Sequence, residues 1–216
     1  MRASLKFLLV LALAIELAFV RSLWLNLAIT ACALIYVIYK KISFKRILWL
    51  IIVGILPFVG GWFMYYTMSP DHSKTFAWIM ATRVYAYIFL GSVLAFSQSM
   101  TALMRGFEQD LHVNPTFVYG ILGALNFLPK MTRQIKIIRA SAKMRGVRLT
   151  VFSPQLYVKA IYNSFVWSNN LSQAMYAHGF LEGKKRSHYH HESIHAKEIY
   201  LFILILVLSI LIALIK

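Results

Sequence analysis

Long runs of uncharged, mostly apolar residues divide the chain, and they constrain its fold more than any other feature. A helix that spans a bilayer needs about 20 such residues. Composition agrees, because 60% of the residues are hydrophobic and only 14% are charged, so the chain is more apolar than a soluble domain. The sequence therefore predicts an all-α, polytopic membrane protein with about five transmembrane helices. These are expected at Leu5–Val20, Leu23–Tyr39, Ile47–Tyr66, Phe76–Met104 and Ile199–Ile215.

Basic residues in the short connections predict the orientation, because cytoplasmic loops carry an excess of Lys and Arg. One side would hold Arg2, Lys6, Lys40, Lys41, Lys45 and Arg46, and the other Arg21 and Lys74. We therefore expect a cytoplasmic N-terminus. The chain then divides into spans one to four over residues 1–104, a cytoplasmic or interfacial coupling-helix region over 105–198, and the last span over 199–216.

An apolar segment opens the coupling-helix region. Asn114 followed by Pro115 is typical of a helix N-terminus, where asparagine caps the helix and proline fits the first turn. The segment continues only to Leu128, so as a helix it would rise about 21 Å, too little to cross a bilayer. We expect it at the inner membrane interface.

Two amphipathic helices are predicted next, one following Pro129 and one beginning at Ser153 and Pro154. They end in Met144-Arg145-Gly146 and Ala177-His178-Gly179. A basic residue followed by glycine is also ordinary capping chemistry, so one such end alone does not establish a function. Residues 111–181 contain many Lys and Arg but no Asp or Glu, which favours an anionic partner.

The first of these helices has one apolar stripe, because Met131, Ile135, Ile138 and Ala142 recur at helical spacing. Most of its basic residues lie off this stripe, toward water, headgroups or an acidic protein. Arg145 is the exception, since it returns to the direction of the stripe in the last turn.

The second helix has a stripe of small side chains, Ser164, Ser168 and Ser172, which repeats every four residues. Small residues let another helix approach closely. We expect Ala140 and Ala142 to supply the opposing surface. Tight crossing would bring both helix ends onto one cytoplasmic platform.

These features resemble the transmembrane T component of energy-coupling factor (ECF) transporters, the group that contains EcfT and CbiQ. The resemblance is carried by the order of the elements and by the segments F-L-P-K…A-S-A-K-M-R-G and A-M-Y-A-H-G-F. The residues that match its two ATPase-docking motifs are Arg145, Gly146, Ala177, His178 and Gly179. Met144 stands where the first motif has alanine, and His178 stands where the second has arginine.

The resemblance implies a non-catalytic scaffold in a prokaryotic plasma-membrane importer of a vitamin or a metal ion. Two ABC-type ATPase subunits would bind ATP and Mg, and a separate membrane S component would bind the substrate. The chain itself would hold no cofactor and no metal. Consistently, its nearest approach to a phosphate-binding loop, residues 179–185, lacks the required spacing and the final Ser or Thr.

The alternative is a membrane-embedded zinc metalloprotease, because residues His191 to His195 match the H-E-x-x-H motif. On a helix the two histidines would share a face, and Glu192 would activate a zinc-bound water. The surrounding tract is basic and rich in histidine, with no obvious third ligand, so a solvated or headgroup-facing tract is the simpler interpretation. Nucleic-acid binding by the basic stretch lacks a known module, and no nucleic-acid partner is expected.

Two ionisable residues, Glu16 and Arg83, are expected in the outer half of the membrane. Such residues usually face the helix bundle and find a partner there. We predict a Glu16–Arg83 pair that links span one to span four, the alternative being that each side chain reaches the interface separately. Cys32 is the only cysteine, so an intramolecular disulfide is excluded and a role in helix packing is expected.

Overall fold

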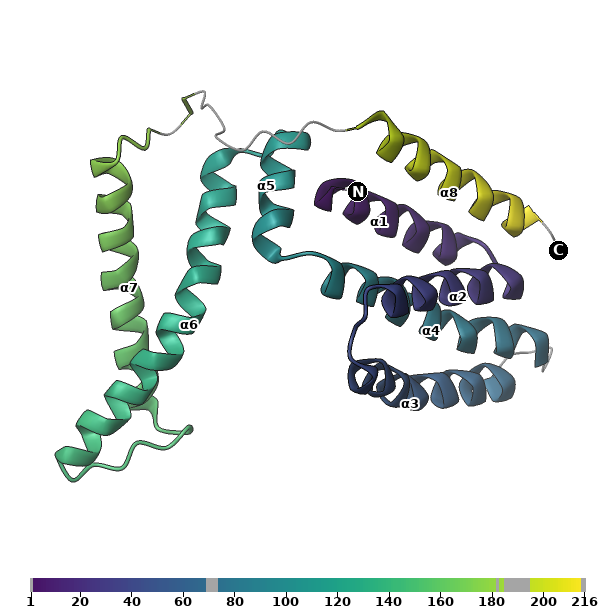
Figure 1. Ribbon diagram of the computed structural model, residues 1–216. Coiled ribbons are helices and arrows are strands. Elements are labelled where there is room, and N and C mark those ends of the chain that lie inside the picture. Colours follow the sequence, from purple (N-terminus) through teal and green to yellow (C-terminus); the bar gives the residue numbers. More distant parts are fainter. Residues whose placement is uncertain (1, 69–73, 182, 185–194, 215–216) are drawn as a thin grey trace. The chain divides into compact units, whose positions relative to one another are not determined.

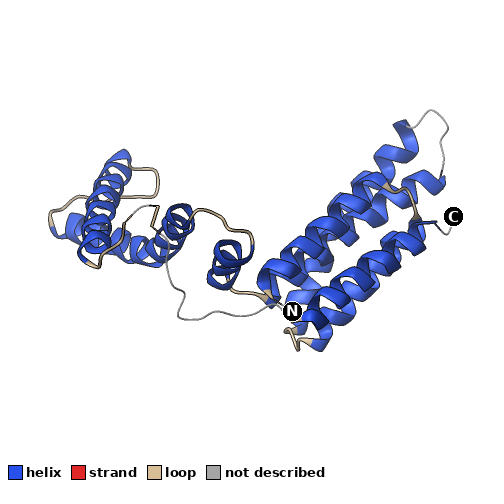
Figure 2. Ribbon diagram, turned by 90° about the horizontal axis from the view of Figure 1, so that it is seen from above, coloured by secondary structure: helices blue, strands red, loops and turns tan. Residues whose placement is uncertain are grey.

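The structure is a computed structural model that describes residues 2–68, 74–181, 183–184 and 195–214. In these ranges every helix or strand assigned is an α helix, so the all-α prediction is confirmed there (Figures 1 and 2). The helices are α1 (Ala3–Phe19), α2 (Leu23–Tyr39), α3 (Phe44–Met68), α4 (Lys74–Ser97), α5 (Met100–Asp110), α6 (Pro115–Met144), α7 (Pro154–Ala177) and α8 (Ala196–Leu214).

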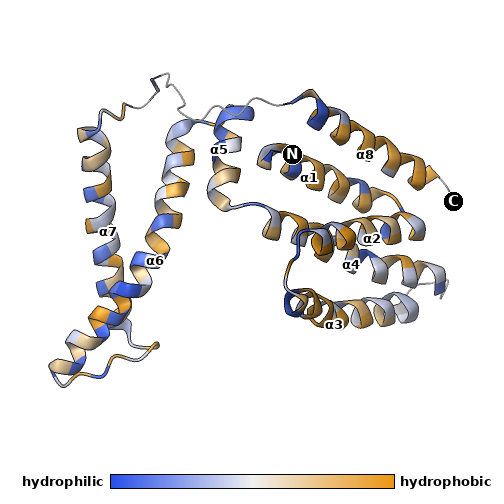
Figure 3. Ribbon diagram, viewed as in Figure 1, coloured by the Kyte–Doolittle hydropathy of each residue, from blue (hydrophilic) through white to orange (hydrophobic). Residues whose placement is uncertain are grey.

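Among the described residues, three helices are long and apolar enough to cross a membrane. They are α3 over Phe44–Thr67, α4 over Lys74–Ser97 and α8 over Ala196–Leu214, while α2 is apolar but shorter. Little of α3 or α8 is buried inside the chain, and Figure 3 shows the length of α8 mostly in the hydrophobic colour. Exposed apolar helices of this length are typical of lipid contact. They indicate a membrane protein.

Contacts divide the chain into two units, residues 1–106 with 192–216 and residues 107–191, and the first boundary falls inside α5. In the first unit α4 packs against α1, α2 and α3, and α8 packs against α1 and α2. One cluster of buried apolar side chains joins α1, α2 and α4 around Leu17 and Leu25, with α8 side chains packed against it. A second cluster joins α2, α3 and α4 around Val37.

The long fourth span predicted over Phe76–Met104 is wrong, because α4 ends at Ser97 and a separate helix begins at Met100. The backbone N–H of Ala102 donates a hydrogen bond to Oγ of Ser99, at a distance of 3.2 Å. A serine that accepts from the N–H three residues later caps the start of a helix. The apolar sequence therefore continues past Ser97, where α4 ends.

The helix predicted to follow Pro129 begins much earlier, at Pro115, and α6 runs through Pro129 without ending. The N-cap itself was predicted correctly, since Oδ1 of Asn114 accepts from the N–H of Thr116 at 3.0 Å. Proline inside a helix removes one hydrogen bond and favours a bend, and α6 bends along its length in Figure 1. The expected interfacial segment and the first amphipathic helix are one continuous element.

Candidate functional site

The C-terminus of α6 is a Schellman cap. The N–H of Gly146 donates to the carbonyl of Lys143 at 3.0 Å, and the N–H of Val147 donates to the carbonyl of Ala142 at 2.9 Å. Gly146 has φ +76°, a left-handed conformation that glycine adopts at little cost. Arg145 is the C-cap residue, with φ −90° and ψ 11°.

The C-terminus of α7 has the same cap. The N–H of Gly179 donates to the carbonyl of Tyr176 and the N–H of Phe180 donates to the carbonyl of Met175, both at 2.9 Å. Gly179 has φ +77°, and His178 is the C-cap residue, with φ −84° and ψ 12°. The two helix ends therefore share both their hydrogen bonds and their backbone conformation.

Arg145 and His178 occupy equivalent positions in the two caps. Both are exposed, as are Gly146, Ala177 and Gly179. A Cβ added to either glycine would meet no atom within 4 Å, so the surface around each cap is open. A cation at this position also interacts favourably with the negative end of the helix dipole, so Arg145 stabilises α6 even without a partner.

The two caps lie at opposite ends of an antiparallel hairpin formed by α6 and α7. Phe180, directly after the α7 cap, contacts Tyr119 near the start of α6, with ring centroids 5.9 Å apart. Between Tyr119 and Arg145 the helix rises roughly 39 Å at about 1.5 Å per residue. Figure 1 shows the connection between α6 and α7 at the far end of the hairpin. The expectation that both motifs share one platform is wrong.

Large side chains line the contact between these helices. The ring of Phe127 stacks on that of Trp167 with centroids 4.6 Å apart, and Nζ of Lys130 lies 5.3 Å from the centroid of the Trp167 ring. Gly123 makes room for Leu171, whose Cδ2 would lie 3.1 Å from a Cβ at that glycine. Side chains of this size hold the helices further apart than a contact between small residues would.

The predicted contact between the serine stripe and the alanines is therefore not formed. Ser168, Ser172 and Ala140 are exposed. Ser164 is half-buried and donates its hydroxyl to a carbonyl of its own helix at 2.8 Å. Ala142 alone of the proposed packing residues is buried. Ser168 and Ser172 therefore lie outside the contact with α6, whereas Ser164 lies next to it.

Sequence reasoning missed the face of α7 that contacts α6. Leu156 and Ala160 are buried, and Trp167 and Leu171 are half-buried. These residues recur at helical spacing, so the apolar stripe was visible in the sequence.

The apolar stripe predicted on α6 does correspond to its less exposed face. Ile138 and Ala142 are buried, and Met131 and Ile135 are half-buried. Arg145, predicted to rejoin this stripe, is exposed instead, and it is the C-cap residue that follows the last turn of α6.

Glu16 and Arg83 have partners other than each other. The Ser209 hydroxyl donates to Oε2 of Glu16 at 2.6 Å. The guanidinium of Arg83 donates from Nη2 to the carbonyl of Val20 at 2.5 Å and from Nη1 to that of Ala18 at 3.5 Å. These carbonyls end α1, where the helix dipole is negative. The expected ion pair is replaced by two separate interhelical contacts, from α8 to α1 and from α4 to α1.

The H-E-x-x-H motif lies almost entirely outside the described residues, which include only its last member, His195. Among the residues that are described, no group of three or more His, Cys, Asp or Glu side chains is arranged to hold a metal ion.

No family model matches this chain, and no curated protein matches it either.

Proposed function

We propose that this chain is the membrane scaffold subunit of an ECF-type nutrient importer. It couples ATP hydrolysis by two partner ATPases to movement of a separate substrate-binding membrane subunit. In this arrangement α1 to α4 and α8 are the five transmembrane helices of a prokaryotic plasma-membrane protein with a cytoplasmic N-terminus, and α6 and α7 are the coupling helices. The observation that supports this most is the pair of equivalent, exposed caps at opposite ends of one hairpin.

The separation of the caps suits two ATPase subunits rather than one. Ends that lie roughly 39 Å apart along a helix cannot enter one small groove, so each end is matched to its own subunit. Arg145 offers a planar fork of donors that matches a carboxylate, whereas the imidazole of His178 has only two ring nitrogens and cannot form such a fork. The α6 end is therefore the stronger of the two docking sites.

An apolar face of α7 supports a further partner in or at the membrane. Tyr157, Val158, Ile161, Tyr162 and Phe165 are all exposed, and their spacing places them on one side of the helix. Exposed apolar patches of this kind mark contact with a protein or a membrane. The substrate-binding subunit and the bilayer interface would cover this face.

Co-purification of ATPase subunits with the full-length chain, from membranes of its own host, tests this function. Arg145→Ala should lose most of the bound ATPase and abolish transport. His178→Ala should lose less, and His178→Arg should retain both ATPases, because a guanidinium restores the stronger donor. Arg148→Ala is the matched control, since Arg148 is also exposed but lies beyond the cap.

Two results would contradict the proposal at different levels. Normal transport by Arg145→Ala with its ATPases attached would show that the end of α6 is not a docking site. Absence of any ATPase from the wild-type preparation, under conditions that keep the membrane complex intact, would refute the coupling function as a whole.

A further inference from the structure

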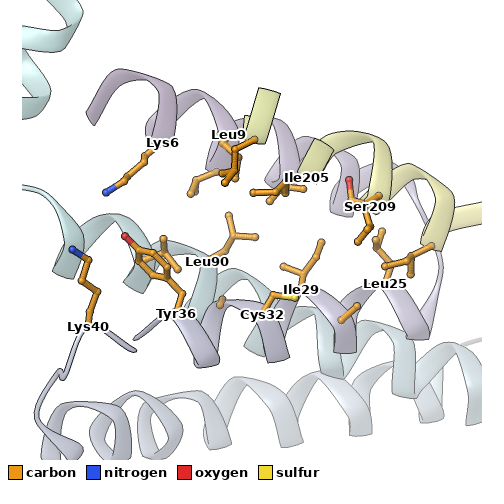
Figure 4. A pocket seen from close by; sticks show the side chains of 18 residues that line it. Lys6, Leu9, Leu25, Ile29, Cys32, Tyr36, Lys40, Leu90, Ile205 and Ser209 are labelled. Atoms are coloured by element: carbon orange, nitrogen blue, oxygen red, sulfur yellow. The ribbon is translucent and has the colours of Figure 1, made fainter. Parts of the chain in front are cut away.

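A cavity of about 520 Å³ lies in the first unit between α1, α2, α4 and α8. That volume is typical of sites that bind a small molecule. Most of its lining is aliphatic, with contributions from Leu9, Leu13, Ile29, Leu90 and Ile205. Figure 4 shows the labelled aliphatic side chains, among them Leu9, Ile29 and Ile205, facing one another across an elongated slot.

The polar groups of this slot gather mainly at one end, where Figure 4 shows Lys6, Tyr36 and Lys40. Lys6 lies in the first turns of α1 and Lys40 is the C-cap of α2, so both belong to the same end of this helix pair. Nζ of Lys6 donates to Oγ of Ser97 at 3.1 Å and lies 5.9 Å from the centroid of the Tyr36 ring. Within the described residues no carboxylate pairs with either ammonium group, so this end of the slot is cationic.

The length of the slot fits a hydrocarbon chain. Its lining extends along α2 from Leu25 to Lys40, a rise of roughly 22 Å as helix. One leaflet contributes about half of the ~30 Å hydrocarbon core of a bilayer. The slot is therefore long enough for an acyl chain whose headgroup lies at the cationic end and whose tail crosses one leaflet.

We propose that this slot binds an anionic phospholipid, with one acyl chain between the helices and the phosphate held by Lys6 and Lys40. Basic pockets between transmembrane helices recognise anionic headgroups in this way. A free phosphate would leave the aliphatic part of the slot unfilled, and a neutral amphiphile would leave the two ammonium groups uncompensated. The lipid fills the space between the α1–α8 pair and the α2–α4 pair, and this role is independent of the proposed coupling function.

Cys32 reports directly on occupancy, because it is the only cysteine, lines the slot and is exposed. The experiment measures the rate at which N-ethylmaleimide alkylates Cys32 in the full-length protein in a neutral detergent. Added phosphatidylglycerol should slow alkylation, whereas phosphatidylcholine and inorganic phosphate should not. The Lys6→Gln/Lys40→Gln variant should need about 30-fold more phosphatidylglycerol for equal protection, since each basic residue near an anionic membrane contributes about a fivefold change.

Lys41→Gln is the matched control, because Lys41 is exposed and adjacent to Lys40 but does not line the slot. A second variant, Ala28→Phe, keeps both lysines and places a ring in the slot. Native mass spectrometry should find phosphatidylglycerol retained by the wild type and by Lys41→Gln, and lost from Ala28→Phe. Equal protection of Cys32 by the two lipids would overturn the proposal. So would equal protection in Lys41→Gln and in the double variant, or protection of Cys32 by a partner protein in a delipidated sample.

Discussion

Replacing Gly146 or Gly179 with alanine should loosen the corresponding helix end, because both glycines have a left-handed backbone, with φ +76° and +77°. A side chain in this conformation costs about 1–2 kcal/mol. A Cβ would meet no atom within 4 Å at either position, so no steric term is added. Alanine also restricts the unfolded chain, which returns about 0.4–1 kcal/mol. The expected net loss is about 1 kcal/mol, or about a fivefold change in a local equilibrium.

Amide hydrogen exchange measures this loss at the bonds that close the caps, the N–H of Val147 and the N–H of Phe180. Exchange at each should accelerate about fivefold in the corresponding alanine variant. Asparagine should have a smaller effect, because it tolerates the left-handed region better than alanine does. Gly120→Ala is the control, since Gly120 lies inside α6 with open space around it and should leave Val147 unchanged. Equal exchange in wild type, Gly146→Ala and Gly146→Asn would refute the assignment of the cap.

Two further predictions concern the first unit, and thermal unfolding in detergent checks both. Gly54→Ala should destabilise the protein by about 1–3 kcal/mol, because the new Cβ would lie 2.5 Å from a tyrosine ring carbon on α4. Gly60→Ala is the control and should not destabilise it, because a Cβ there would meet no atom within 4 Å. Equal unfolding temperatures for the two variants would contradict the close contact of α3 with α4. Glu16→Gln and Arg83→Gln should each weaken a charge-assisted hydrogen bond, of a kind that contributes about 1.5–3 kcal/mol, and their losses should add because the two side chains have separate partners. If the double variant loses clearly less stability than the sum of the two single losses, Glu16 and Arg83 interact directly after all.

Helix positions were predictable wherever the signal was local. The bounds of α2, Leu23–Tyr39, coincide with the predicted span, and Pro154 begins α7 as expected. In each case a break in the apolar run or a proline at a helix start provides the boundary within a few residues. The glycine caps belong to the same class, since Gly146 and Gly179 are C′ residues in the structure as in the sequence analysis.

Boundaries that depend on weaker signals were missed. The break after α4 depends on the single hydroxyl of Ser99 within an apolar stretch, and hydropathy does not detect it. Pro129 predicts a boundary between two elements, yet α6 continues through it. Proline is compatible with a helix interior where the loss of one hydrogen bond is offset by contacts elsewhere, such as the stacking of Phe127 on Trp167 in α6 and α7.

Partners distant in sequence were predicted least well. The sequence shows that Arg83 is ionisable but not which way its side chain faces. Backbone carbonyls occur at every residue, so the sequence cannot indicate which of them accept hydrogen bonds from the guanidinium. In the structure these carbonyls, at Ala18 and Val20, receive the guanidinium. Likewise, the antiparallel course of α6 and α7 depends on contacts such as Tyr119 with Phe180, which connect residues far apart in the chain. Periodicity gives the face of a helix but not the neighbour that covers it.

Helix geometry explains the glycines of the two caps better than it explains their C-cap side chains. Backbone conformation accounts fully for Gly146 and Gly179, because each is the left-handed residue that closes its Schellman cap. It accounts only partly for Arg145, since the dipole of a helix end contributes about 0.3–1 kcal/mol and any cation supplies it. It does not account for the side chain of His178, because backbone N–H groups of Gly179 and Phe180 close the α7 cap. The exposed C-cap side chains, rather than the glycines, are therefore the residues on which a docking function must be tested.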